Sequence, residues 1–217
     1  MRIIAGTYRS RRLDAPPGLN TRPTSDRLRE TLFNVLAPRI RGAWFLDLYA
    51  GSGAVGLEAL SRGAAKVTFV ERAPAALKML RRNLEQLGIE NGYEVRAESV
   101  AAFLRTVTKT TPKPMPHEVP KLIPHEVVFP KRYEVAFIDP PYDAMQEYAA
   151  TLGLLGEAAR GDLAPGVLVV AEHRRNQNLE EQYGCLKRTR LLKQGDAALS
   201  FYEAEVELPD PATAGLA

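Results

Sequence analysis

The sequence has few of the features that mark secreted, membrane-spanning or metal-binding proteins. Its 217 residues include one cysteine, Cys185, so an intramolecular disulfide is impossible. Every apolar run falls short of the roughly 18 residues that a transmembrane helix needs. Residues 1–6 lead directly into an Arg-rich stretch without a secretory apolar segment. Cysteine and histidine never cluster with the spacing of a zinc site. We therefore expect a cytoplasmic protein without a metal ion.

Basic charge is concentrated at one end of the chain. Apolar residues make up 45% and charged residues 25% of the sequence, which is typical of a globular protein and unlike a disordered chain or a coiled coil. Residues 1–41 hold nine arginines, no lysine and three acidic residues, a net charge of +6, whereas the remaining residues carry −3. A basic arm on a mildly acidic body favours a polyanionic partner. The alternative is a solvated surface rich in arginine.

Short apolar segments alternate with helical segments over most of the chain. Strands are expected at residues 3–6, 12–13, 44–48, 66–71, 93–96, 133–138, 166–171, 186–193 and 199–206, and helices at 24–36, 54–61, 74–87, 100–106 and 146–160. The first helix is expected to begin with Thr24 or Ser25 as its cap and to end before Pro38. The central strands are mainly apolar without a polar alternation, as strands buried on both faces are. The pattern predicts an α/β fold, a mostly parallel sheet with helices on both faces.

The order of these segments divides the chain into three parts. Residues 1–41 are expected to form a basic hairpin-and-helix extension, residues 42–208 the main domain, and residues 209–217 a flexible tail. An insertion at about residues 107–131 interrupts the main domain with six prolines, a density that forbids a helix. Within it, residues 116–119 (Pro-His-Glu-Val) recur as residues 124–127. A duplicated surface loop explains this repeat better than a metal site, because no third, distant group of ligands accompanies it.

A glycine-rich turn follows the first strand of the main domain. Gly51, Gly53 and Gly56 have G-x-G-x-x-G spacing, which lets the backbone approach a ligand at a helix N-terminus. Glu71 ends the next strand, where a carboxylate can accept hydrogen bonds from both ribose hydroxyls, so the two features indicate an adenosine cofactor. Asp47 would repel a pyrophosphate but suits a cationic ligand, which favours S-adenosylmethionine over a dinucleotide. Two alternatives stay open. The glycine turn can serve only the close packing of strand against helix, and Asp47 can serve as a cap for that turn.

The segment Asp139-Pro140-Pro141-Tyr142 follows the fourth strand of the main domain. In an open α/β sheet it points into the same crevice as the glycine turn. The segment suits methylation of an exocyclic amino group, because Asp139 Oδ and the Pro140 carbonyl can each accept one amino hydrogen and so orient the nitrogen lone pair. Two successive prolines hold that carbonyl in place, and Tyr142 can stack on a base that has left its helix. The alternative is a Pro-rich strand end with a capping Asp.

Several stretches together resemble the bacterial RsmD family, the 16S ribosomal RNA guanine-N2 methyltransferases. They are residues 2–6 with 12–13, residues 22–36 (RPTSDRLRETLFNVL), residues 46–61 with the three glycines, and residues 137–142 (FIDPPY). The resemblance covers residues 1–105 and 132–206, and residues 22–36 are its most specific part. It implies a Rossmann-like class I methyltransferase fold with a seven-stranded sheet, one antiparallel strand and a small N-terminal hairpin. It also implies methyl transfer from S-adenosylmethionine to N2 of a guanine in 16S ribosomal RNA, preferably in the assembled 30S subunit.

The expected site residues form three groups. Those expected to bind the cofactor are Asp47, Tyr49, Gly51, Ser52, Gly53, Glu71, Arg72, Glu98, Ser99 and Asp139. Those expected to take part in catalysis are Asp139, Pro140 and Tyr142, and those expected to bind substrate are Arg2, Arg9, Arg11, Arg12, Arg22, Thr24, Arg27 and Tyr142. Ser99, preceded by Glu98, stands where relatives often place Asp or Asn against the adenine, so either side chain or a backbone group is expected there. The protein is expected to be a monomer.

Three other functions stay open on the sequence alone. A methyltransferase for adenine N6 in RNA or DNA would use the same amino chemistry, although no room exists for a DNA target-recognition domain. A nicotinamide-dependent oxidoreductase would use the glycine turn but would leave Asp139 and Tyr142 without a role. An RNA-binding assembly factor with a vestigial pocket conflicts with the intact Asp139 and Glu71.

Overall fold

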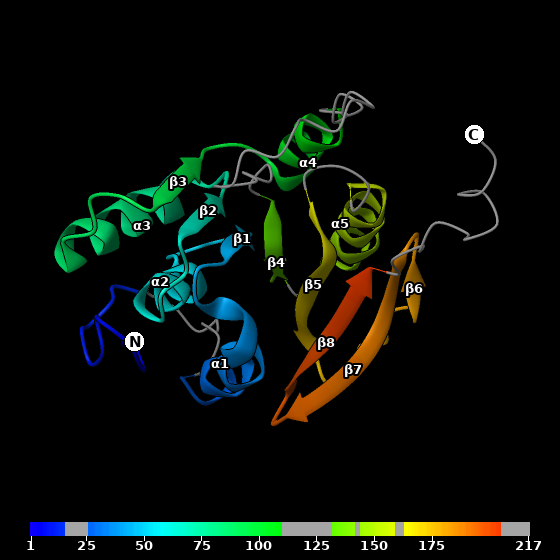
Figure 1. The fold of residues 1–217 in the computed structure, drawn as a ribbon, viewed down its shortest axis with the longest axis horizontal. Coiled ribbons are helices and arrows are strands. Elements are labelled where there is room, and N and C mark those ends of the chain that lie inside the picture. Colours follow the sequence, from blue (N-terminus) through cyan, green and yellow to red (C-terminus); the bar gives the residue numbers. More distant parts are fainter. Residues whose placement is uncertain (16–25, 110–131, 142–143, 159–162, 205–217) are drawn as a thin grey trace, which may run out of the picture.

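One continuous sheet forms the centre of the molecule. The computed structural model describes residues 1–15, 26–109, 132–141, 144–158 and 163–204. The sheet has the strand order β3-β2-β1-β4-β5-β8-β7-β6 (Figure 1). The strands are β1 (Trp44–Leu48), β2 (Lys66–Val70), β3 (Tyr93–Arg96), β4 (Tyr133–Ile138), β5 (Leu163–Arg174), β6 (Gln182–Tyr183), β7 (Leu186–Gln194) and β8 (Ala197–Ala204). β1 to β5 pair in parallel, and β8 is antiparallel to both of its neighbours.

This topology confirms the predicted α/β fold with its mostly parallel sheet. The seven strands expected in the main domain are all present, and β8 is the antiparallel strand inserted between β5 and β7. The two-residue strand β6 adds an eighth strand that the sequence did not indicate, paired with the start of β7. Strand order reverses between β1 and β4, which is the place where open α/β sheets bind their ligands.

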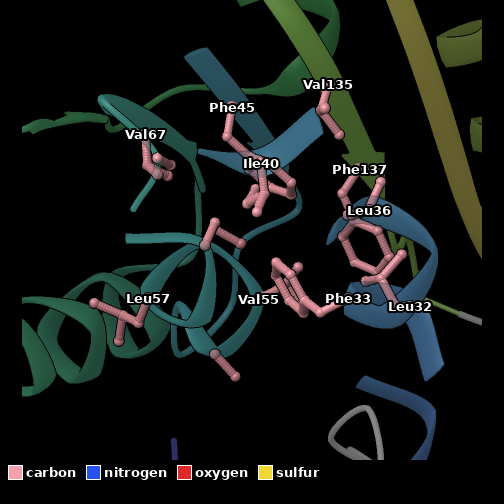
Figure 2. Close-up of a cluster of buried hydrophobic side chains, with 14 of the residues drawn as sticks. Leu32, Phe33, Leu36, Ile40, Phe45, Val55, Leu57, Val67, Val135 and Phe137 are labelled. Atoms are coloured by element: carbon pink, nitrogen blue, oxygen red, sulfur yellow. The ribbon is translucent and has the colours of Figure 1, made fainter. Parts of the chain in front are cut away.

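Within the described residues, five helices cover the two faces of the sheet. They are α1 (Asp26–Ile40), α2 (Ala54–Ser61), α3 (Pro74–Leu87), α4 (Val100–Lys109) and α5 (Met145–Ala158). α1, α2 and α3 share one hydrophobic core, part of which is drawn in Figure 2, and α4 and α5 share the other. In the part of the chain that the structure describes, no helix is both long and apolar enough to cross a membrane.

The central strands alternate their side chains between these two cores. Phe45 on β1 and Val135 on β4 face α1 and α2, whereas Leu46 and Ala136 beside them face α4 and α5. All four are fully buried, so polar side chains are disfavoured in the middle of these strands on either face. Polar groups of β1 and β4 therefore gather near the strand ends, and the carboxyl ends carry the residues of the candidate site.

Helix α1 is longer than the sequence predicted. Pro38 does not end it, because the helix continues through this residue to Ile40. Proline removes one backbone hydrogen bond, but it stands in the last turn, where contacts beyond it compensate. Ile40 is buried in the core, and Arg39 Nη1 donates to the Gly166 carbonyl at 2.9 Å. Helix α4 also extends further than expected, and β5 begins earlier, at Leu163.

Residues 1–15 form a hairpin-like extension against α2 and α3. Ile3 N donates to the Arg11 carbonyl at 3.0 Å, and Ser10 N donates to the Ile3 carbonyl at 2.9 Å. Pairing is limited to a single antiparallel bridge between Arg2 and Arg12, so the two predicted strands are reduced to one bridge. The predicted cap at Thr24 or Ser25, most of the insertion and the C-terminal tail lie outside the described residues.

Candidate active site

The carboxyl ends of β1, β2 and β4 bring the predicted cofactor turn and the predicted catalytic segment together. Ala50 N donates to the Val70 carbonyl at 3.0 Å, which joins the turn to the end of β2. Asp139 N lies 3.4 Å from the Leu48 carbonyl, which joins the catalytic segment to the end of β1. Two motifs that are far apart in the sequence therefore lie at the same edge of the sheet, where open α/β sheets bind ligands.

Glu71 fixes the glycine turn from the neighbouring strand. Its Oε2 accepts a hydrogen bond from Gly51 N at 2.9 Å, and its Oε1 accepts one from Ala73 N at 2.7 Å. Gly53 N closes the turn by donating to the Ala50 carbonyl at 2.7 Å. A carboxylate has about four acceptor positions, so these bonds leave Glu71 able to accept ribose hydroxyls as well. The predicted ribose contact itself stays a prediction.

Asp47 caps the helix that follows the turn. Its side chain is 2% exposed, and Oδ2 accepts a hydrogen bond from Gly56 N in the first turn of α2 at 2.9 Å. A Cβ at Gly56 would lie 2.3 Å from the Phe69 ring and 2.9 Å from Asp47 Oδ2, so only glycine allows this approach. Burial, reinforced by the negative charge of Glu71, raises the pKa of Asp47 to about 7. The capping role that the sequence left open is therefore present.

Tyr49 holds the start of the turn against helix α5. Its φ of 64° lies in the left-handed region, which few residues other than glycine adopt. The phenolic oxygen lies 2.8 Å from Glu147 Oε2 and 2.7 Å from Thr151 Oγ1. Burial raises the pKa of this hydroxyl, so it stays protonated and can donate. These contacts hold the strained backbone in place, which is a pattern common at functional sites.

Asp139 lies close to the carboxylates of Glu172 and Asp47. Burial raises its pKa well above the ordinary value, and the negative charges of Glu172 and Asp47 raise it further. The next residue, Pro140, is buried, and its carbonyl lies 3.5 Å from the Tyr148 hydroxyl. That hydroxyl also donates to the Glu172 carbonyl at 2.9 Å. Tyr148 thus ties the predicted catalytic segment to the end of β5.

The two side chains expected near the adenine both have protein partners. Ser99 Oγ accepts a hydrogen bond from Ala102 N at 3.2 Å, which makes Ser99 the N-cap of α4. Glu98 Oε1 is paired with the Arg96 guanidinium at 2.8 Å. Arg72, another expected cofactor contact, is exposed beside the end of β2. The Ser99 hydroxyl keeps its proton to donate, but its acceptor capacity is partly used.

Comparison with known proteins places the chain in a family. The family described as conserved hypothetical protein 95 matches residues 1–203. "Ribosomal RNA small subunit methyltransferase D" of Escherichia coli strain K12 is 34% identical over 209 residues, covering 95% of this chain and 91% of that protein. The chain belongs to this family. The resemblance seen in the sequence is thereby confirmed.

Solved structures of similar proteins have the same architecture. The Escherichia coli protein yhhF superposes with a TM-score of 0.73 at 32% identity, covering 94% of this chain and 98% of that one. The Thermus thermophilus protein TTHA0928 superposes with a TM-score of 0.70 at 31% identity, covering 94% of this chain and 99% of that one. Both superpositions therefore extend over nearly the whole of this chain.

The basic extension of this family member presents most of its predicted contacts to solvent. Arg2, Arg9, Arg12 and Arg27 are exposed, as substrate contacts must be. Arg11 is also exposed, but one of its N–H groups donates to the Gln86 carbonyl on α3 at 2.7 Å. The other expected substrate residues, Arg22, Thr24 and Tyr142, lie outside the described residues.

Sequence reasoning missed several side chains that support this site. Glu172 follows the apolar run of β5 just as Asp139 follows that of β4, so the same rule would have found it. Tyr148 and Asn83 lie inside helices, where nothing in the local pattern sets them apart. Glu58 on α2 is fully buried and accepts hydrogen bonds from the backbone of the N-terminal extension. Only tertiary placement gives these three residues a role.

Proposed function

We propose that this methyltransferase transfers a methyl group from S-adenosylmethionine to the exocyclic N2 of a guanine in 16S ribosomal RNA, within the assembled small subunit. The observation that carries the proposal is that Asp139 lies beside Asp47 and the end of β1, directly before the glycine turn. The name of the Escherichia coli relative supports ribosomal RNA as the substrate. The guanine N2 position and the subunit context rest on the resemblance described above.

The charge of the crevice suits a cationic cofactor. Besides burial, the negative charge of Glu71 raises the pKa of Asp47, and the charges of Glu172 and Asp47 raise the pKa of Asp139. Such a cluster attracts a sulfonium and an ammonium group and repels a pyrophosphate. Glu71 would hold the ribose, and Asp47 with residues 51–53 would hold the methionine part. When bound, S-adenosylmethionine supplies an electrophilic methyl group.

The catalytic segment would orient the amino group of the base. An exocyclic nitrogen is a poor nucleophile because its lone pair is delocalised into the ring. Asp139 Oδ and the Pro140 carbonyl would each accept one amino hydrogen, which turns the lone pair toward the methyl donor. The Pro140 carbonyl has two lone pairs, so its 3.5 Å contact with Tyr148 leaves one for the substrate. Asp139 needs no unusual basicity, because the nitrogen becomes acidic as it is methylated.

The N-terminal extension would hold the ribosomal RNA. Arg2, Arg9 and Arg12 are exposed on the hairpin and can contact phosphates. Tyr142, directly after the catalytic prolines, would stack on the guanine once it has left its helix. The protein would act as a cytoplasmic monomer, with residues 1–41 as the substrate arm and residues 42–208 as the methyltransferase domain.

The experiment that tests this proposal maps tritium from labelled S-adenosylmethionine onto ribosomal RNA. Purified 16S ribosomal RNA and assembled small subunits are each incubated with the protein, and the labelled nucleoside is identified after digestion. We expect N2-methylguanosine at a single position, with more label in assembled subunits. Label in N6-methyladenosine would replace guanine by adenine as the target, and no label in either substrate would overturn the proposal. A parallel titration with NAD separates a nicotinamide-dependent enzyme, which would bind it.

A further inference from the structure

The N-terminal hairpin is fastened to the methyltransferase domain by buried polar side chains of α2 and α3. On α2, Glu58 accepts hydrogen bonds from Ile4 N at 2.7 Å and Ala5 N at 3.0 Å. Ser61, also on α2, accepts one from Tyr8 N at 3.0 Å. These contacts hold the near end of the hairpin and lie along the helix that leads away from the cofactor turn. The far end of the hairpin, around Asp14, is held differently.

Asn83 on α3 holds the far end of the hairpin and the cofactor turn with one side chain. Its Oδ1 accepts a hydrogen bond from Asp14 N at 2.8 Å, and its Nδ2 donates to the Asp14 carbonyl at 3.1 Å. The same Nδ2 group donates to the Ser52 carbonyl at 2.9 Å. Asn83 is fully buried, so water cannot easily replace any of these bonds. The amide uses its acceptor and both of its donors on two segments that are distant in sequence.

We propose that Asn83 is a positioning residue for the cofactor turn, and that it fixes the turn by locking it to the N-terminal hairpin. This inference rests on the proposed function, because it assumes that the turn holds the cofactor. The turn is clamped from two sides. Glu71 accepts from Gly51 N on the β2 side, and Asn83 donates to the Ser52 carbonyl on the α3 side. Glu71 thus fixes the peptide N–H of Gly51 and Asn83 fixes the carbonyl of Ser52, both within the turn of residues 50–53.

The clamp gives the hairpin a part in cofactor binding. A glycine-rich turn without fixed peptide groups would have to be ordered when the ligand binds, and that ordering lowers affinity. Asn83 fixes the Ser52 carbonyl only while Asp14 keeps the amide in its orientation, through two hydrogen bonds. An ion pair between Arg82 and Asp14 at 3.1 Å holds the same point from outside. The hairpin therefore preorganises the turn besides carrying arginines for the substrate.

The test compares two variants of Asn83 with a variant that loosens the other end of the hairpin. Asn83→Leu keeps the branched shape but is larger and removes every side-chain hydrogen bond, and Asn83→Ala removes the same bonds by leaving a cavity instead. Ser61→Ala is the matched control, because Ser61 is buried and bonds the hairpin at Tyr8 N and the Ala5 carbonyl without touching the turn. Binding of S-adenosylhomocysteine to the full chain is measured by calorimetry without RNA, well below each melting temperature. Amide hydrogen exchange of Gly51 and Gly53 is measured on the same samples.

We expect both Asn83 variants to weaken S-adenosylhomocysteine binding about tenfold, the change that loss of one buried hydrogen bond produces. Ser61→Ala should stay within about twofold of the parent, and only the Asn83 variants should exchange faster at residues 51–53. Equal affinity in parent and Asn83 variants would overturn the role of Asn83, as would a loss of the same size in Ser61→Ala. If Asn83→Leu does not fold, Asn83→Ala and the exchange data decide. A parent that binds no S-adenosylhomocysteine would instead overturn the proposed function.

Discussion

Asp139 stands beside Glu172 and Asp47, and this neighbourhood decides what its carboxyl group can do. Burial and the two negative charges raise its pKa, so the proton is retained more strongly than in water. A protonated carboxyl would donate where the proposed reaction needs an acceptor. A cationic ligand in the crevice would lower that pKa again. The acceptor role of Asp139 is therefore expected to depend on the bound cofactor.

The first prediction follows from this acceptor role. Asp139→Ala should lower the rate of methyl transfer by about two to three orders of magnitude, or roughly 3–4 kcal/mol, as loss of a positioned polar group does. Asp139→Asn keeps one acceptor oxygen and should retain part of the activity. Single-turnover methyl transfer to small subunits measures both variants, with cofactor affinity as the control for folding. If Asp139→Ala transfers methyl groups as fast as the parent, the segment that follows β4 has no catalytic role.

The second prediction concerns Glu71. Glu71→Ala removes the acceptor of Gly51 N and the proposed ribose contact, so S-adenosylmethionine should bind roughly 1–3 kcal/mol more weakly. Glu71→Gln keeps one acceptor oxygen and should lose less. Calorimetry on the two variants measures the effect directly. Unchanged affinity in Glu71→Ala would mean that the turn holds its shape and its ligand without this carboxylate.

At the scale of elements, the hairpin is expected to act as the RNA-binding unit. Arg9→Ala and Arg12→Ala should each lower the slope of log K against log salt for 16S ribosomal RNA by about 0.7–0.9, because each removes one phosphate contact. Arg105→Ala on α4, which packs on the opposite face of the sheet, is the control and should leave the slope unchanged. Cofactor affinity should be the same in all three. A slope that no variant changes would make the hairpin arginines solvated surface only.

Docking of the hairpin on α2 depends on one glycine. Gly6 has φ +84°, and a Cβ there would lie 1.8 Å from the Ser61 carbonyl oxygen. Gly42 has φ +78° with nothing within 4 Å of its Cβ position, so it shares the backbone conformation without the close approach. Gly6→Ala should therefore destabilise the protein by at least about 1 kcal/mol more than Gly42→Ala, which carries only the backbone strain. Urea unfolding of both variants tests this. Equal losses of stability would show that the hairpin accommodates the added methyl group at Gly6 without a cost in free energy.

Elements were predictable where local chemistry determines them. The segments at β1, α2 and α3 have the predicted bounds, because apolar runs, Gly53 and Pro74 mark them in the sequence. Helix α1 passes Pro38 because Ile40 and Arg39 gain tertiary contacts, which a local rule cannot include. The hairpin was predicted as two strands, but it docks through α2 and α3 and pairs at one bridge only.

At the scale of the whole molecule, the site was predictable where it follows strand ends and not where it depends on docking. Asp47, Glu71 and Asp139 were found because each lies at or directly after the carboxyl end of a strand, and parallel strands end at one edge. Asn83 belongs to the site only because α3 lies between the hairpin and the turn. No spacing in the sequence encodes that arrangement. The protein therefore gathers its acidic groups by topology and its supporting groups by tertiary packing.

The grouping of carboxylates around Asp47 makes the stability of the whole protein depend on pH. The pKa of Asp47 is about 7 in the folded chain, whereas an unfolded chain ionises aspartate near pH 4. Between these values the folded state binds more protons than the unfolded state, so the free energy of unfolding falls as pH rises. The slope from this group is roughly 1.4 kcal/mol per pH unit at most, and it vanishes above about pH 7. Ionisation of Asp47 at neutral pH therefore lowers the stability of the folded protein when no ligand is bound.

The last prediction tests this pH dependence and its link to the cofactor. Urea unfolding of the parent between pH 5 and 8 should show that the free energy of unfolding decreases as the pH rises toward 7. Asp47→Asn should make this decrease smaller. Glu90→Gln, at an exposed position after α3, is the control and should leave it unchanged. Because a cation favours ionised Asp47, the affinity for S-adenosylmethionine should rise through about pH 7. S-adenosylhomocysteine lacks the sulfonium charge, so its affinity should rise less over the same pH range. Parallel pH profiles for the two ligands would mean that the acidic crevice does not sense the charge on sulfur.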